Sequence, residues 1–480
     1  MKIVTLACRD VGHPTIPPGL EGVVYVDDLC RRPGDLTRWI GDADRLVAIV
    51  HTTELSLAKI QRSARIAGID PLGIQYLSAD TIAGDTRRAA LLIEGASARV
   101  AAFGESQPEH ARPTFRGRRT RRDLLSVPQP HYEVVPLIDD HTCAAADGCR
   151  ACVTECPQAA YRWELGHVHF DREACVACGR CVTACPTGAI GNPTIGGQAL
   201  VDQIAALVGE AASDPIGIAF VCRQRTNHIT SIDWAEVEVP CTGMVPATWP
   251  IAALLLGGAA AAVVPCTANG CGLGNDARAV ETVALARELI ESAGLDPASA
   301  TAAPGRLSAR ISRVDLDDPF GTHGPTEVAL ALHSLAVNPI PITGSGPTAG
   351  RGIVTIDSTA CTLCLRCTET CPSSALQSDA PSGRLRVMFD AALCTGCFQC
   401  VPACPELENG AIRVERRIDT DALRTGPQPL AESTTSQCEL CGAPIASSAM
   451  LGRIAQLLGS EHGAAAQYLE RRCLNCRGTH

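Results

Sequence analysis

Four short cysteine runs, each ending in Cys-Pro, constrain this chain more than any other feature. Three of them have the spacing C-x2-C-x2-C-x3-C-P, which is typical of bacterial ferredoxins. In that pattern three thiolates bind one four-iron cluster and the fourth thiolate binds the neighbouring cluster. A disulfide framework would not impose the same loop repeatedly, so the runs predict four 4Fe-4S clusters. The cysteines are Cys143, Cys149, Cys152 and Cys156; Cys175, Cys178, Cys181 and Cys185; Cys361, Cys364, Cys367 and Cys371; and Cys394, Cys397, Cys400 and Cys404.

The crossing rule predicts which cysteines share a cluster. In each ferredoxin module, the first three cysteines of one run pair with the last cysteine of the other run. The predicted sets are Cys361, Cys364 and Cys367 with Cys404; Cys394, Cys397 and Cys400 with Cys371; and Cys175, Cys178 and Cys181 with Cys156.

The run that begins at Cys143 is irregular, because Ala146 stands where the first cysteine is expected. Either a longer loop brings Cys143 to the iron, or the cluster loses a corner and holds three irons. We favour Cys143 as the ligand, together with Cys149, Cys152 and the crossing Cys185.

Strand and helix patterns alternate in two further stretches, which predicts two small α/β units with parallel sheets. The expected strands are Ile3–Ala7, Val23–Val26, Leu46–Val50, Ile216–Val221, Val237–Val239 and Ala260–Val264, and the expected helices are Leu55–Ala67 and Ala279–Ala293. The predicted order is an α/β unit at 1–110, a linker at 111–133, a double 4Fe-4S module at 134–192, a second α/β unit at 198–320, a second double 4Fe-4S module at 351–415 and a four-cysteine tail at 436–480. A Gly/Pro-rich joint is expected at 344–350.

Composition excludes some functions. The net charge is −10 with no basic face to neutralise phosphates, which argues against nucleic acid as a partner. The longest apolar stretch, Trp249–Val264, is shorter than a membrane span and is interrupted by Gly257-Gly258. The first residues have the pattern of a strand rather than of a secretory signal. We therefore expect a soluble, cytoplasmic protein without membrane insertion, in which thiols stay available to metal.

Cysteines also follow the strands of the second α/β unit. Cys222, Cys241 and Cys266 each follow an apolar strand, and Cys271 comes five residues after Cys266. Because the carboxyl ends of parallel strands meet at one edge, these four thiolates should converge there. Such a set suits a 2Fe-2S cluster, while the alternative is a group of buried structural cysteines.

The same stretch resembles the delta subunit of methyl-viologen-reducing hydrogenase. The resemblance rests on Cys222, on Pro240-Cys241-Thr242-Gly243-Met244, and on the segment from Pro265 to Asn275. It implies a 2Fe-2S cluster and a link between a hydrogenase or formate dehydrogenase and heterodisulfide reductase. The family usually has a further cysteine three residues after the first, where this chain has Arg225.

The first α/β unit and the paired ferredoxin modules are similar to the A subunit of heterodisulfide reductase. The matching residues are the segments Leu46–Thr53 and Ala67–Pro71. That subunit also carries a flavin in a dinucleotide-binding domain. No G-x-G-x-x-G follows a strand here, so no flavin is expected.

Two smaller groups of potential ligands remain. Cys8, Cys30 and His51 also follow strands, but they lack an evident fourth ligand, so we expect structural thiols there. In the tail, Cys438 and Cys441 form one Cys-x2-Cys pair, and Cys473 and Cys476 form another. This spacing predicts a zinc-ribbon-like site, with rubredoxin-like iron as the alternative.

No catalytic residues stand out in the sequence. The favoured interpretation is a multi-cluster electron-transfer subunit that carries electrons between a catalytic oxidoreductase and a second acceptor. The partner would be a hydrogenase, a formate dehydrogenase or a heterodisulfide-reductase-like enzyme. Two alternatives stay open: a redox-sensing or scaffolding iron–sulfur protein, and a reductase with a flavin bound in an unusual way.

Overall fold

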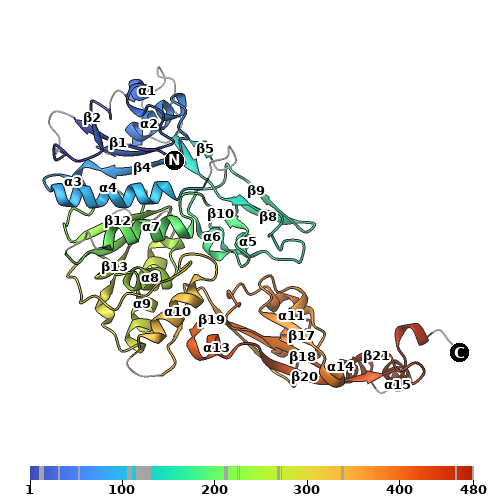
Figure 1. Cartoon of the computed structure of the whole chain (residues 1–480). Helices are drawn as coiled ribbons and strands as arrows, with labels where there is room; N and C mark the ends of the chain where they lie inside the picture. The colour runs from blue at the N-terminus through green and yellow to red at the C-terminus, as the bar shows by residue number, and fades with distance from the viewer. Residues whose placement is uncertain are drawn as a thin grey trace.

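The structure is a computed structural model of the 480-residue chain. Two α/β units lie together at one end of an elongated molecule, and the C-terminal tail extends at the other end (Figure 1). The structure describes residues 1–9, 16–30, 33–51, 54–104, 111–114, 131–209, 214–223, 225, 228–266, 271, 273–336, 340–459 and 462–477. Residues 52–53, most of the predicted linker, 267–270 and 272 lie outside this description.

The first α/β unit is a parallel sheet in the order β2-β1-β3-β4. Its strands are β1 (Ile3–Arg9), β2 (Val23–Asp27), β3 (Arg45–Val50) and β4 (Ile74–Ser78), and its helices are α1 (Leu36–Ile40), α2 (Glu54–Ile66), α3 (Ala79–Ile82) and α4 (Thr86–Ala101). From Leu46 to Val50 every residue of β3 is buried, because helices cover both faces of a central parallel strand.

The second α/β unit has the same arrangement, with parallel strands in the order β12-β11-β13-β14. The strands are β11 (Gly217–Cys222), β12 (Trp234–Val239), β13 (Ala260–Val264) and β14 (Ala300–Thr301), and the helices are α7 (Gly197–Val208), α8 (Thr248–Leu255), α9 (Asn275–Ser292) and α10 (Gly324–Ser334). Helix α8 is buried along its whole length, which explains why its sequence is apolar without being a membrane span.

The two α/β units pack against each other through α4 and α7 (Figure 1). A Cβ atom on Gly95 of α4 would lie 2.9 Å from the side chain of Leu207, so the helices need a small residue there. Arg88 donates to the carbonyls of Ile232 and Trp234, and Arg99 donates to the Gln203 side chain. These bonds pair the two buried arginines with acceptors across the interface.

The first cysteine-rich module lies beside these units. Short antiparallel strands frame its two cysteine loops. They are β7 (Leu137–Ile138) with β10 (Ile190–Gly191) and β8 (Tyr161–Glu164) with β9 (His167–Phe170), and the loops carry the helices α5 (Ala151–Glu155) and α6 (Arg180–Ala184). At the two ends of the predicted linker, β5 (Ala111–Thr114) pairs with β6 (His131–Val134). Backbone pairing therefore ties the two ends of that segment together.

The second cysteine-rich module merges with the tail. One sheet contains β15 (Thr343–Ser345), β19 (Ile412–Asp419) and β16 (Gly352–Ile356); the other contains β17 (Leu376–Asp379), β18 (Arg384–Phe389), β20 (Gln428–Gln437) and β21 (Pro444–Ser447). The helices are α11 (Arg366–Glu369), α12 (Cys400–Ala403), α13 (Thr420–Thr425), α14 (Ser448–Leu458) and α15 (Gly463–Arg471). Because β20 pairs with β18, the tail continues the module's sheet. The expected joint at 344–350 begins inside a strand.

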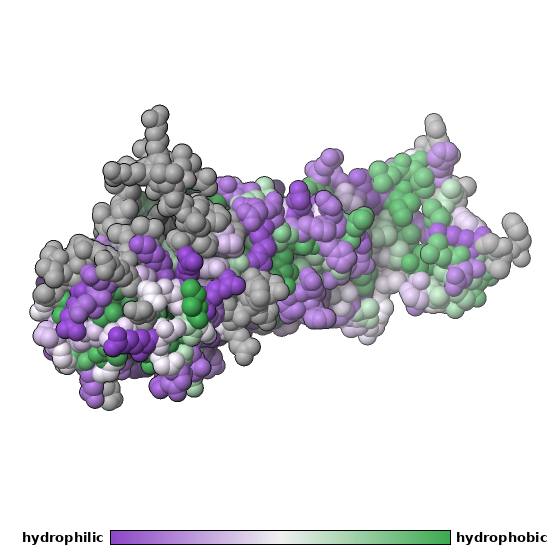
Figure 2. Space-filling view, turned by 90° about the horizontal axis from the view of Figure 1, so that it is seen from above, coloured by the Kyte–Doolittle hydropathy of each residue, from purple (hydrophilic) through white to green (hydrophobic). Residues whose placement is uncertain are grey.

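The predicted mixed α/β architecture agrees with the structure, and every expected strand and helix overlaps an observed one. No helix within the described residues is both long and apolar enough to cross a bilayer. Hydrophobic residues gather at the tail end of the surface (Figure 2), where Leu440, Leu457 and Leu474 are exposed.

Candidate iron–sulfur centres

The three regular cysteine loops have the same backbone geometry. In each loop, the residue before the second cysteine and the residue after it have positive φ. These residues are Ala177 and Gly179, Leu363 and Leu365, and Gly396 and Phe398. Left-handed backbone at alternate positions turns successive N–H groups towards one centre, which favours a bound anion such as an iron–sulfur cluster. In two of the loops the first cysteine already accepts such a bond, from Ala177 N–H to Cys175 Sγ (3.2 Å) and from Leu363 N–H to Cys361 Sγ (3.4 Å).

The structure brings the cysteines together in the four predicted sets. We name each set after the first cysteine of its run, with the crossing cysteine last: the 143 set (Cys143, Cys149, Cys152, Cys185), the 175 set (Cys175, Cys178, Cys181, Cys156), the 361 set (Cys361, Cys364, Cys367, Cys404) and the 394 set (Cys394, Cys397, Cys400, Cys371). In every set, burial raises the pKa of the third cysteine, and negative charge on the other three thiols raises it further. A metal centre binds the thiolates in place of the thiol protons, and its positive charge offsets this repulsion.

The irregular loop brings Cys143 into the 143 set. Ala146 is exposed to solvent, whereas Cys143 is close enough to the Cys185 thiol for that charge to raise its pKa, after burial as the main cause. The extra residues form tight turns that Trp163 braces, since its indole N–H donates to the Ala145 carbonyl at 2.9 Å. Four thiols therefore surround this centre, as they do in the regular sets.

A cavity lies within the 361 set. All four of its cysteines line the cavity, and the rest of the wall is mostly apolar, with Ile356, Val387 and Ile412. Sulfur ligands inside an apolar shell suit a 4Fe-4S cluster and limit the access of water to it.

The strand-end cysteines of the second α/β unit also converge. We call Cys222, Cys241, Cys266 and Cys271 the 222 set. The Cys222 thiol is the main cause that raises the pKa of Cys241. Burial raises the pKa of Cys266 to about 11, a hydrogen bond with Cys222 lowers it, and charge on Cys241 and Cys271 raises it further. The four thiols thus share one edge of the sheet, and their arrangement suits a 2Fe-2S cluster.

A hydrogen-bond chain reaches the 222 set from the first module. Asn275 at the start of α9 donates from Nδ2 to Cys241 Sγ at 3.1 Å, and it is fully buried. Arg180 of α6 in turn donates to Asn275 Oδ1 at 3.0 Å. Asp276 lies beside Cys266 and Cys271, with all three ligand atoms within 4.8 Å of one another. Asn275 belongs to the segment that resembles the hydrogenase delta subunit, but neither its contact with Cys241 nor the position of Asp276 beside Cys266 could be predicted from the sequence.

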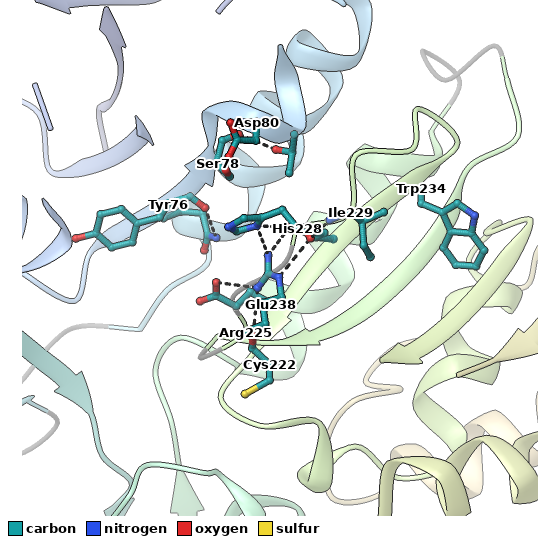
Figure 3. A network of polar contacts seen from close by, with 12 residues as sticks. Tyr76, Ser78, Asp80, Cys222, Arg225, His228, Ile229, Trp234 and Glu238 are labelled. Atoms are coloured by element: carbon teal, nitrogen blue, oxygen red, sulfur yellow. Dashed lines mark hydrogen bonds and ion pairs between the residues drawn. The ribbon is translucent and has the colours of Figure 1, made fainter. Parts of the chain in front are cut away.

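Arg225, where the resembling family has a cysteine, belongs to a separate polar network. It forms ion pairs with Glu236 and Glu238, and it donates to the Cys222 carbonyl at 3.2 Å. Figure 3 shows that the Cys222 thiol points away from this network. Arg225 therefore holds the loop after β11 in place and does not take the position of a metal ligand.

The five sets lie in sequence along the molecule. Charge on Cys241 raises the pKa of Cys178, so the 222 set adjoins the 175 set. Tyr161 lies between the 175 set and the 143 set. Burial is the main cause that raises its pKa, and the Cys181 and Cys175 thiols of one set and the Cys152 thiol of the other raise it further. Charge on Cys397 likewise raises the pKa of Cys149, and the Arg150 N–H donates to Gln399 Oε1 at 3.0 Å, which joins the 143 and 394 sets. Cys367 similarly affects Cys400, which joins the 394 and 361 sets.

Glu155 holds three parts of the chain together at the middle of this series. Its side chain is 9% exposed and forms ion pairs with Arg180, with Arg278 of α9 and with Arg416 of β19. Burial alone would raise the pKa of Glu155, but the three guanidinium groups lower it below its usual value. An ionised carboxylate therefore fixes the first module against both its neighbours.

The four tail cysteines form a separate group. Their sulfurs lie within 4.8 Å of one another, and Cys441 Sγ is 3.6 Å from both Cys473 Sγ and Cys476 Sγ. Ligands about 2.3 Å from a tetrahedral zinc ion are about 3.8 Å apart, so the group fits one ion. The tail contacts the 361 set's loops, since Ser447 Oγ donates to the Thr362 carbonyl and Arg453 pairs with Glu406.

Comparison with known families supports the ferredoxin patterns. Residues 168–191 match a 4Fe-4S binding domain, and residues 353–405 match a 4Fe-4S dicluster domain. No curated protein matches the chain. The loop geometry and the two matches define an iron–sulfur protein whose 4Fe-4S segments indicate electron transfer.

Proposed function

We propose that this chain is an electron-transfer subunit with five iron–sulfur clusters in series. The observation that carries the proposal is the order of the cysteine sets: 222, 175, 143, 394 and 361. Each set would hold one cluster, four of the 4Fe-4S type and, in the 222 set, one of the 2Fe-2S type. Such clusters exchange single electrons when bound.

The two ends of the series have different surroundings. The 222 set lies in the part that resembles the hydrogenase delta subunit, where Cys222 and Cys241 are buried and Cys266 and Cys271 are partly buried. The 361 set lies beside the tail, where Leu440, Leu457 and Leu474 are exposed and where Figure 2 shows a gathering of hydrophobic residues. Exposed apolar residues near a terminal cluster suit contact with a protein partner. The resemblance favours a hydrogenase, formate dehydrogenase or heterodisulfide-reductase-like enzyme as the catalytic partner. The spacing of the two Cys-x2-Cys pairs favours zinc as the tail ion.

The proposal is tested by removing the junction between the two modules. Cys397→Ala should disrupt the 394 set, which lies between the first module and the 361 set. After substoichiometric reduction, freeze-quench EPR should show rapid redistribution of electrons over all clusters in the wild-type protein. In the variant, redistribution between the two halves should become slow and dependent on protein concentration.

Cys441→Ala, in the tail, serves as the control and should leave the redistribution rapid. If Cys397→Ala redistributes electrons as fast as the wild type, independently of concentration, the series does not run through the 394 set and the proposal is wrong.

A further inference from the structure

The two α/β units are structural repeats of each other. Both have four parallel strands, and in both the first strand lies between the second and the third. The third strand also pairs with the fourth in each unit. In both units the carboxyl ends of the parallel strands therefore gather at one edge of the sheet. In the second unit the 222 set lies at this edge.

The pairing register places Cys8 and His51 at positions equivalent to those of two ligands of the 222 set. Ala7 pairs with Ile49, so Cys8 follows the first partner by one residue and His51 follows the second by two. In the second unit Val221 pairs with Val264, and Cys222 and Cys266 follow by one and two residues. Cys30 follows β2 as Cys241 follows β12, although it lies farther from its strand.

We propose that Cys8, Cys30 and His51 bind a single transition-metal ion of zinc's class. Their ligand atoms lie within 4.8 Å of one another, which is close to the spacing of about 3.8 Å around a tetrahedral ion. Both cysteines are buried. The backbone already supports thiolates there: the Cys30 N–H donates to Cys8 Sγ and the His51 N–H donates to Cys30 Sγ, each at 3.3 Å.

A single ion fits this site better than a cluster does. Cys271 comes five residues after Cys266, whereas the residue five positions after His51 is Ser56, so the fourth thiolate has no counterpart. Two thiolates and a neutral imidazole balance one divalent charge, and binding releases the two thiol protons to solvent. Three protein ligands leave a fourth position for water, as in zinc sites with two cysteines and one histidine.

The test counts metal in the full-length chain, purified anaerobically. The double variant Cys473→Ser/Cys476→Ser first removes the tail ion from the count. Adding His51→Ala should lower zinc, or iron if iron occupies the site, by one equivalent per chain. Adding Cys8→Ser should do the same. X-ray absorption of the double variant, if zinc is present, should show two sulfur ligands and at least one nitrogen ligand.

Two further variants make the result specific. His51→Cys keeps a ligand at the position and should keep the ion. His167→Ala, at an exposed position of strand β9, should leave the metal content unchanged. Unchanged absorbance of the iron–sulfur clusters verifies that each variant folds. Zinc and iron contents that stay unchanged in both His51→Ala and Cys8→Ser would overturn the proposal. Loss of two or more irons with sulfide would also overturn it, because it would reveal a cluster.

Discussion

Tyr161→Phe should lower the reduction potential of the cluster in the 175 set. Tyr161 is fully buried, and its hydroxyl donates to Cys181 Sγ at 3.3 Å. A donor to a cluster sulfur stabilises the reduced state more than the oxidised state, because the reduced cluster carries more negative charge. Removing the hydroxyl while keeping the ring, which stacks on Phe170, isolates this single bond.

The size of the shift follows from the worth of one hydrogen bond. A net difference of about 1 kcal/mol between the two redox states corresponds to about 40 mV for a one-electron couple. An EPR-monitored potentiometric titration should therefore show one four-iron component moved to lower potential by about this amount, with the other components unchanged.

Tyr468→Phe is the matched control, since the Tyr468 hydroxyl donates to the Arg477 carbonyl in the tail. That variant should leave all potentials in place. A shift of Tyr161→Phe to higher potential, or the absence of any shift, would refute the assignment of this hydroxyl to a cluster ligand.

Three further predictions test other parts of the site. Asn275→Ala should lower the reduction potential of the two-iron cluster proposed for the 222 set by about 40 mV, because Cys241 loses a buried hydrogen-bond donor. A two-iron signal with an unchanged midpoint potential in the same titration would contradict this. Glu155→Gln should destabilise the chain by about 3 kcal/mol in anaerobic unfolding, because three arginines lose their buried carboxylate partner. Glu432→Gln is the control and should have little effect on stability, because the ion pair of Glu432 with Arg384 is exposed to solvent. Folding lowers the pKa of Glu155, so the stability of the folded chain that depends on its charge is present above the unfolded pKa and is lost as the pH falls through the folded pKa. The difference in unfolding free energy between wild type and Glu155→Gln should therefore be largest above the unfolded pKa and disappear in acid. A difference in unfolding free energy that grows in acid would contradict this prediction. A chelator should remove the tail ion through exposed Cys441 without bleaching the clusters, and joint loss of both would show that the tail is not a separate site.

Local patterns predicted the fold well where the chain repeats a strong signal. The strand Ala260–Val264 was predicted to the residue, because it is a short apolar run bounded by Gly-Gly and Pro-Cys. The cysteine sets were also predictable, since ligand spacing is a local property and the crossing rule adds the distant fourth residue. The pairing of β5 with β6 was missed because each strand has only four residues and Pro113 interrupts the pattern of β5.

Interactions between domains could not be predicted. Glu155 has no unusual sequence context, and its three arginine partners come from three different elements, so only the folded chain shows their convergence. The hydrogen bonds from Tyr161 to Cys181 and from Asn275 to Cys241 could not be predicted either, because a donor to a sulfur distant in the sequence leaves no periodic signal. Cys8, Cys30 and His51 were visible in the sequence as strand-end residues like those of the second α/β unit, and the strand register adds that Cys8 and His51 occupy positions equivalent to Cys222 and Cys266.

The most direct test of the five-cluster series is the iron and sulfide content of anaerobically purified protein, measured together with its EPR spectra on stepwise reduction. Four four-iron clusters and one two-iron cluster predict about eighteen irons in clusters, with interacting four-iron signals and a separate two-iron signal. About sixteen irons with no two-iron signal would contradict the series as proposed, because the 222 set would then hold no cluster.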